Sequence, residues 1–224
     1  MKPVRIMVFY DGNFFKQGQI FFRYKENLGW FSLPQLHNLF ERYIAEKQNS
    51  VPELTKVVGA HYYDGRTSPN ASSDKALRRE RGFEMSLITA GIVPHYLPLR
   101  EVERDQENPD MPQFRLAQKG VDVELALDVL DYAHDDRFDI AVLVSGDQDF
   151  VPLVRKVTSL GKQVLVAYFH IDQWTDEAQI YHRPTYCSTA LIKAASLTLN
   201  FNEILQEEDY WESDSGSLFF MPRR

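Results

Sequence analysis

The sequence is poor in cysteine and has no long apolar run, so it lacks the residues that disulfide frameworks, cysteine-based zinc sites and membrane spans require. Its 224 residues include one cysteine, Cys187, which excludes an intramolecular disulfide and a zinc site built on cysteines. All of its apolar runs are too short to span a membrane, and the run at 4–10 is too short for a signal peptide. We therefore expect a soluble cytoplasmic protein with no membrane partner, and a buried, unreactive Cys187.

The sequence also lacks an excess of positive charge. Its net charge is −7, which argues against a general polyanion binder, so any nucleic-acid surface must be local. The histidines do not show a spacing typical of a metal site or a catalytic triad. A hydrophobic content of 44% and a charged content of 25% are typical of a globular domain with a sizeable core.

Apolar runs of strand length alternate with segments of helical periodicity along most of the chain. The strand-like runs lie at 4–10, 54–63, 92–97, 140–144, 164–167 and 197–201. This alternation predicts a three-layer α/β/α sandwich with a mainly parallel sheet. We assign residues 1–201 to this domain and 202–224 to an acidic, flexible tail in which 218–221 could dock. We also expect short helices across 174–181 and a turn at Asp64.

Four aspartates stand where strands end or helices begin. Asp11 and Asp147 follow apolar strands, Asp149 is two residues further on, and Asp122 opens a helix. Carboxyl ends of parallel strands share one edge, so these side chains are expected to converge. Carboxylates that repel one another in a shared site require a cation or a proton, and oxygen ligands favour Mg²⁺ or Mn²⁺. The alternative for each aspartate alone is a helix cap.

Three motifs carry a resemblance to a known family. YDGNF at 10–14, KGVDVELALD at 119–128 and VLVSGDQDFVPLV at 142–154 resemble the NYN family, of the LabA/DUF88 type, in the PIN-like nuclease superfamily. The resemblance extends from about 4 to 169, and in part to 201. It implies a Rossmann-like PIN fold and a divalent-metal-dependent ribonuclease that hydrolyses phosphodiester bonds of RNA.

The same resemblance assigns roles to individual residues. It implies that the acidic metal-site residues are Asp11, Asp122, Asp147 and Asp149. Asn13 and Ser145 are the polar residues that accompany them, Asn13 to orient Asp11 or a water, and Lys119 could face a phosphate.

Substrate contacts outside the motifs are expected from a basic cluster and from aromatic residues. Arg78, Arg79 and Arg81 lie on one predicted helix and could contact single-stranded RNA, or could form an ordinary solvated face. The aromatic residues within 14–24 could stack on bases or belong to the core.

Other functional classes stay open from sequence alone. A non-catalytic RNA-binding or regulatory scaffold would use the same fold, with the tail as a site for a protein partner. A phosphatase of the haloacid-dehalogenase kind expects a second aspartate two residues after the first, where this chain has Asn13. A dinucleotide-binding dehydrogenase lacks its G-x-G-x-x-G after the first strand. A homo-oligomer is also compatible with the sequence.

Overall fold

The computed structural model describes residues 2–66, 74–103, 114–117, 120–206, 212–213 and 216–221. Within these ranges the side chains of 74–76, 100–103, 114–117, 212–213 and 216 are not described. No helix in the described ranges is both long enough and apolar enough to cross a membrane.

Six described strands form one central sheet in which every neighbouring pair is parallel. The order across the sheet is β11-β8-β7-β1-β3-β4. The strands are β1 (Val4–Asp11), β3 (Thr55–Arg66), β4 (Ile92–Pro98), β7 (Ile140–Val144), β8 (Gln163–Tyr168) and β11 (Leu197–Asn200). The predicted parallel α/β fold is therefore confirmed, with β1 and β7 at the middle of the sheet.

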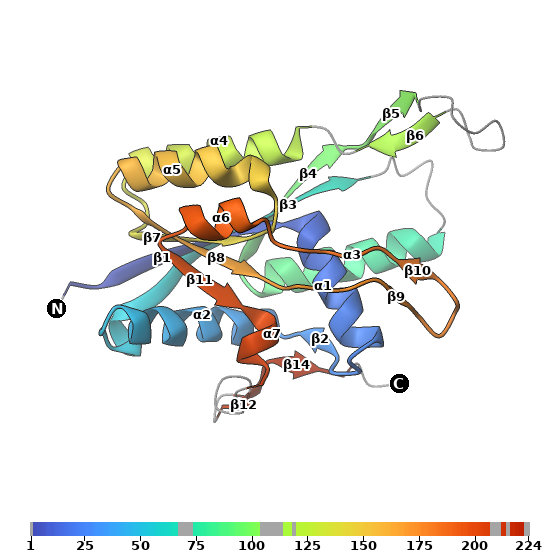
Figure 1. The fold of residues 1–224 in the computed structure, drawn as a ribbon, viewed down its shortest axis with the longest axis horizontal. Helices are drawn as coiled ribbons and strands as arrows, with labels where there is room; N and C mark the ends of the chain where they lie inside the picture. Colours follow the sequence, from blue (N-terminus) through green and yellow to red (C-terminus); the bar gives the residue numbers. More distant parts are fainter. Residues whose placement is uncertain are drawn as a thin grey trace.

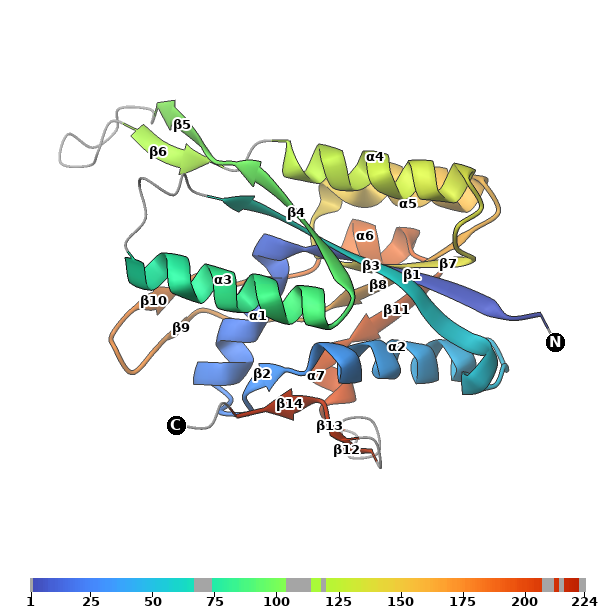
Figure 2. The ribbon, with the colours of Figure 1, turned by 180° about the vertical axis from the view of Figure 1, so that it is seen from behind.

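Helices cover both faces of this sheet, which gives three layers (Figures 1 and 2). The helices α4 and α5 lie on one face with α6 beside them, and α1, α2 and α3 lie on the other. The helices are α1 (Gly12–Tyr24), α2 (Leu33–Lys47), α3 (Asp74–Thr89), α4 (Val121–His134), α5 (Val151–Ser159), α6 (Thr189–Ala194) and α7 (Phe201–Ile204). The described ranges also contain the short 3₁₀ helices η1 (Pro52–Leu54) and η3 (Gln148–Phe150).

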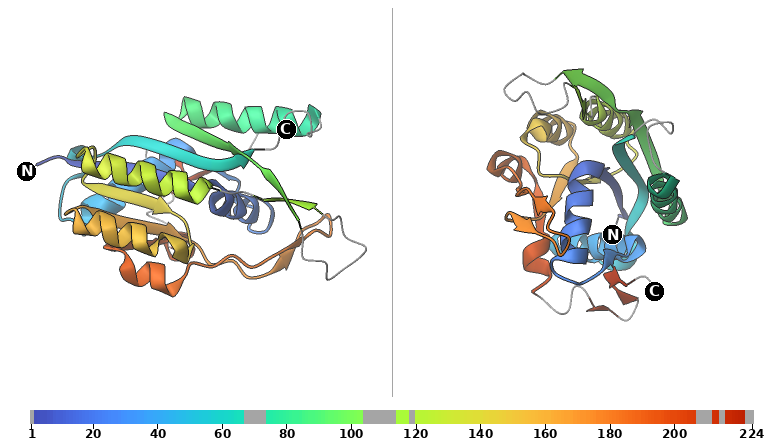
Figure 3. Two further views of the ribbon diagram at one scale, coloured as in Figure 1. Left: turned by 90° about the horizontal axis from the view of Figure 1, so that it is seen from above. Right: turned by 90° about the vertical axis from the view of Figure 1, so that its right-hand side faces the viewer.

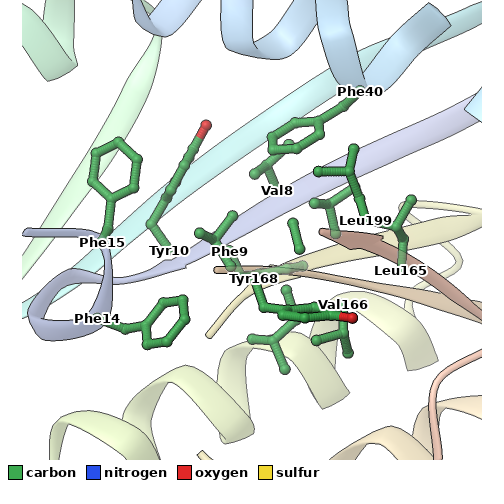
Figure 4. Close-up of a cluster of buried hydrophobic side chains, with 14 of the residues drawn as sticks. Val8, Phe9, Tyr10, Phe14, Phe15, Phe40, Leu165, Val166, Tyr168 and Leu199 are labelled. Atoms are coloured by element: carbon green, nitrogen blue, oxygen red, sulfur yellow. The ribbon is translucent and has the colours of Figure 1, made fainter. Parts of the chain in front are cut away.

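The core lies between the sheet and both helical layers. The strands β1, β7 and β8 are buried along most of their length, as their nearly continuous apolar sequences require of a covered parallel sheet. Figure 4 shows one part of this core, where side chains of β1 and α1 lie near those of β8 and β11. Phe14 stacks on Phe169 with ring centroids 4.2 Å apart, which fixes the first turn of α1 to the end of β8.

Helix α4 is held against the sheet by a polar cluster on β3 and β4. The hydroxyl of Tyr63 donates to Asp128 of α4 at 2.8 Å, and the ring of Tyr63 stacks on His95. His95 Nδ1 lies 3.7 Å from Asp128, and its other ring nitrogen contacts His61 at 3.1 Å. These contacts orient the helix whose first turn carries Asp122.

Two local predictions are wrong. Residues 174–181 do not form helices, because β9 (Trp174–Thr175) and β10 (Tyr181–His182) pair as an antiparallel hairpin. Asp64 is not a turn residue, because β3 continues through it to Arg66. Its buried carboxylate accepts a hydrogen bond from Tyr62 at 2.9 Å and forms an ion pair with Lys16 of α1.

Short antiparallel pairs complete the described structure. The strands β5 (Arg100–Glu103) and β6 (Phe114–Ala117) pair beyond the end of β4. Near the end of the chain, β12 (Glu212–Ser213) pairs with β13 (Gly216–Ser217), and β14 (Phe219–Phe220) pairs with β2 (Trp30–Phe31). Leu218 and Phe219 are buried, so this part of the predicted tail does dock. The predicted flexibility concerns mostly 207–211, 214–215 and 222–224, which lie outside the described residues, and the boundary at 201 stays a prediction.

Candidate active site

The candidate site lies where the strand order reverses. From β1 the chain continues to β3 and β4 on one side, whereas β7, β8 and β11 lie on the other. In open α/β sheets such a switch point is the usual place for ligands, at the carboxyl ends of the strands. Asp11 is the last residue of β1, and Ser145 to Asp147 follow directly after β7.

Asp11 is held by two hydrogen bonds from different elements. Its Oδ1 accepts from the backbone N–H of Phe14 at 3.2 Å, so Asp11 caps α1. Its Oδ2 accepts from the hydroxyl of the buried Ser145 at 2.9 Å. Gly12 allows this placement, because a Cβ there would lie 2.5 Å from the carbonyl oxygen of Tyr63. The carboxylate therefore bridges the ends of β1 and β7.

Asp147 and Asp149 lie on the loop that leads from β7 into η3. Asp147 Oδ1 accepts from the backbone N–H of Asp149 at 2.9 Å, and its own N–H donates to Ser145 Oγ at 3.2 Å. Ser145 thus accepts from the loop while it donates to Asp11. Asp11 and Asp147 do cap α1 and η3, and each also has oxygen lone pairs left over for a ligand.

Electrostatic coupling joins the four aspartates. Burial raises the pKa of Asp11 to about 6, and the charges of Asp122 and Asp147 add to the increase. Partial burial, followed by the charges of Asp147 and Asp149, raises the pKa of Asp122. Among the residues that the structure describes, no lysine or arginine forms an ion pair with any of the four. The site is therefore a concentration of negative charge without a counter-ion from the described chain.

The donor set fits a hard divalent cation only in part. No three aspartate, glutamate, histidine or cysteine side chains in the described ranges form a group that could hold a metal ion. Mg²⁺, however, keeps several waters and is commonly held by one or two carboxylates together with substrate phosphates. Oxygen-only donors around Asp11 and Asp147 match that chemistry, with a substrate completing the coordination.

A pocket of about 780 Å³ opens beside the aspartates. Asp11, Asn13 and Asp147 line it, and so do all residues from 181 to 188. Asp122 and Asp149 are not among the lining residues. The pocket is therefore large enough for a nucleotide-sized group, with carboxylates on one side.

A family comparison identifies the domain. The family model named NYN domain matches residues 5–196. The chain belongs to the NYN domain family. This family is part of the PIN-like nuclease superfamily, so the sequence resemblance and the Rossmann-like fold that it implied are confirmed.

Solved structures add information on the fold alone. A protein of unknown function from Vibrio parahaemolyticus superposes with a TM-score of 0.50 at 22% identity, covering 89% of this chain and 93% of that one. A predicted oxidoreductase from Parabacteroides merdae gives a TM-score of 0.28 at 9% identity, covering 89% and 32% of the two chains, and supports no argument. A search of curated proteins found no match.

The predicted substrate contacts of this NYN domain are not all brought to the pocket. Arg78, Arg79 and Arg81 are exposed on α3, and none of them lines the pocket. Seen from the carboxyl edge of the sheet, α3 and the β9–β10 hairpin lie on opposite sides of α1 (Figure 3, right). Lys119 lies outside the described residues, and its role stays a prediction.

The aromatic residues of α1 belong mainly to the core. Phe14, Phe15 and Phe22 are buried, so of the two alternatives the core is the correct one for these three residues. Sequence reasoning instead missed 181–188, although its Tyr-His-Arg-Pro-Thr-Tyr pattern combines aromatic rings with a cation. Cys187 of this segment is buried, as expected, and burial raises the pKa of its thiol to about 12.

Proposed function

We propose that this NYN domain is a divalent-metal-dependent ribonuclease that hydrolyses phosphodiester bonds of single-stranded RNA. The observation that carries the proposal is the coupling of Asp11, Asp122 and Asp147 at the switch point, without a cation from the described residues. Asp11 is partly buried whereas Asp122 and Asp147 are exposed, so the cost of keeping them together comes from mutual repulsion and from the burial of Asp11. A ligand cation removes that cost. Membership of the PIN-like nuclease superfamily supports the same chemistry.

The chain's residues have separate roles in this proposal. In hydrolysis a water oxygen bonds to phosphorus while the bond to the leaving oxygen breaks, and Mg²⁺ or Mn²⁺ would supply water activation and charge stabilisation. Asp11 and Asp147 would hold the ion, with Asp122 and Asp149 acting through bound waters. Ser145 fixes the Asp11 carboxylate through its 2.9 Å hydrogen bond. Asn13, exposed in the pocket wall, would orient a water or a phosphate oxygen.

A non-catalytic RNA-binding scaffold is the second candidate. The observation in its favour is that the described residues contain no group of three metal-ligating side chains. The two candidates differ in whether the aspartates are needed for a reaction, because a scaffold would bind RNA without cleaving it.

The decisive experiment measures cleavage of a 5′-labelled single-stranded RNA with Mg²⁺ or Mn²⁺, in the wild type and in Asp147→Asn. We expect metal-dependent cleavage that falls at least about 100-fold in the variant, the loss typical of removing one electrostatic stabiliser of a transition state. Asp136→Asn is the matched control, because it makes the same change at an exposed aspartate that pairs with Arg5 and Lys162 at the opposite edge.

Two outcomes would contradict the proposal. Cleavage that persists in excess chelator would exclude the metal, and equal rates in the wild type and Asp147→Asn would exclude the aspartate site. RNA binding without any cleavage in either metal would favour the scaffold.

A further inference from the structure

The segment 171–188, called the arm here, forms a hairpin that projects beyond the carboxyl ends of the central strands (Figures 1 and 3). It is an ordered structure with its own contacts. Ile171 and Thr185 exchange two backbone hydrogen bonds of 2.8 Å at its base. Trp174 stacks on His182 with centroids 4.1 Å apart and meets Phe21 of α1 edge to face. The arm is thus fixed to α1 and holds a defined shape.

The arm is also attached directly to the loop that carries Asp147. The backbone N–H of Ser188 donates to the carbonyl of Gly146 at 2.8 Å. A Cβ on Gly146 would lie 2.6 Å from the carbonyl oxygen of Tyr186, so only glycine allows the two segments to approach this closely. Arm and acidic loop therefore line one pocket side by side, and backbone contacts set their spacing.

The surface that the arm presents to this pocket combines one cation with two aromatic rings. Arg183 is exposed, and in the described part of the chain no carboxylate pairs with it. Tyr181 and Tyr186 line the pocket with 57% and 52% of their surfaces exposed. Their hydroxyls donate to Gln173 at 3.2 Å and to Asp172 at 2.7 Å, and Tyr186 also contacts the ring of His170. These contacts restrain each ring while about half of its surface stays exposed.

We propose that the arm is the RNA-binding surface of the site, with Arg183 contacting a phosphate and Tyr181 and Tyr186 stacking on unpaired bases. This inference rests on the proposed function, because it names the surface that delivers the strand to the aspartates. Aromatic faces bind bases only where the bases are not stacked in a duplex, so the arm selects single strands. Restrained rings lose little conformational entropy on binding. The arginine cluster of α3 lies across α1 from the arm and contributes less to RNA binding in this proposal.

The test measures binding separately from cleavage. A fluorescein-labelled single-stranded oligoribonucleotide is titrated by anisotropy against wild type in chelator, and against Asp147→Asn in Mg²⁺. Into both backgrounds we place Arg183→Gln, Tyr186→Leu, Tyr186→Phe and, as the rival surface, Arg78→Gln combined with Arg79→Gln. Melting temperatures confirm that each variant folds, which exposed positions favour.

Arg183→Gln should weaken binding and reduce the magnitude of the salt slope by about 0.7, the value for one phosphate contact on a single strand. Tyr186→Leu should weaken binding roughly 5- to 100-fold, whereas Tyr186→Phe keeps the ring and should stay close to the parent. Blunt duplex RNA of the same sequence should bind less tightly than the single strand.

Several outcomes would overturn the proposal that the arm binds RNA. These are no measurable binding by either parent, unchanged binding in both Arg183→Gln and Tyr186→Leu, a loss confined to the α3 double variant, or tighter binding of the duplex. Failure of the proposed function is a different result: single-stranded RNA bound through the arm, with no metal-dependent cleavage by the wild type.

Discussion

Each of the two edges of the central sheet holds an aspartate, and the surroundings shift the pKa of these two carboxyl groups in opposite directions. At the amino edge, Asp139 accepts from the backbone N–H of Arg5 at 2.9 Å and from its guanidinium at 3.0 and 3.1 Å. These hydrogen bonds, with the charge of Arg5, lower the pKa of Asp139 to about 2. At the carboxyl edge, burial and neighbouring carboxylates raise the pKa of Asp11 to about 6.

The difference distinguishes a carboxylate that stabilises the fold from one that awaits a ligand. Asp139 has its cation within the chain, so its charge favours folding. Asp11 has hydrogen-bond donors but no cation from the described residues, so at neutral pH its charge opposes folding. Asp64 shows that position at the carboxyl edge does not decide this, because Lys16 neutralises it there. Groups that cost stability in this way are typical of functional sites.

The largest effect that we expect from this comparison is a stability gain on removing the charge of Asp11. Asp11→Asn should raise the free energy of unfolding by about 1–3 kcal/mol at pH 7 in chelator, since a pKa rise of about two units costs the ionised form that much. Urea unfolding with an unchanged m-value measures it. The gain should be small at pH 4, where the carboxyl of the folded protein is already protonated.

The matched variant is Asp139→Asn, for which the opposite sign is expected. It should lower the free energy of unfolding by about 1–2 kcal/mol, because the Arg5 guanidinium loses a charged acceptor that it contacts at two atoms. Equal losses in both variants would show that the two edges do not differ in the way described.

Sequence patterns predicted the strands and the acidic edge because both depend on local signals. The run 140–144 is apolar throughout and the run 4–10 is apolar except for Arg5, which a covered strand or a buried helix explains, and their length favours a strand. The hairpin at 174–182 carries no such signal, because contacts of Trp174 with His182 and with Phe21 of α1 hold it. The pairing of Asp64 with Lys16 likewise depends on how α1 packs against β3. Tertiary contacts of this kind are not encoded in a local pattern.

The next effect in size concerns the missing cation. If Asp11 and Asp147 hold a divalent ion, Mn²⁺ at ten times its dissociation constant should stabilise the wild type by about 1.4 kcal/mol. For a chain of this length that is a rise of about 3–6 °C in melting temperature. Asp11→Asn should lose most of the rise, whereas Asp139→Asn should keep it. A rise of the same size in all three proteins would place the ion elsewhere.

The smallest effect concerns how the free energy of unfolding changes with pH below 7. Asp139 and Asp11 should change it in adjacent pH ranges and with opposite signs. Asp139 has a folded pKa of about 2, below the 3.8 of its ordinary value, so its contribution is present above about pH 4 and lost as pH falls toward 2. Asp11 has a folded pKa of about 6, so the wild type should lose stability as pH rises from 4 to 6. Because solvent screens the ion pair of Asp139 with Arg5, we expect the pH-dependent contribution of Asp139 to the free energy of unfolding to be only about 1 kcal/mol.

Unfolding free energies measured from pH 2 to 7 should therefore show Asp139→Asn approaching the wild type at the acid end. Asp11→Asn should depart from the wild type only above pH 4. Curves that stay parallel across the range would mean that neither carboxylate changes its proton affinity on folding, and the contrast between the two edges would have no electrostatic basis.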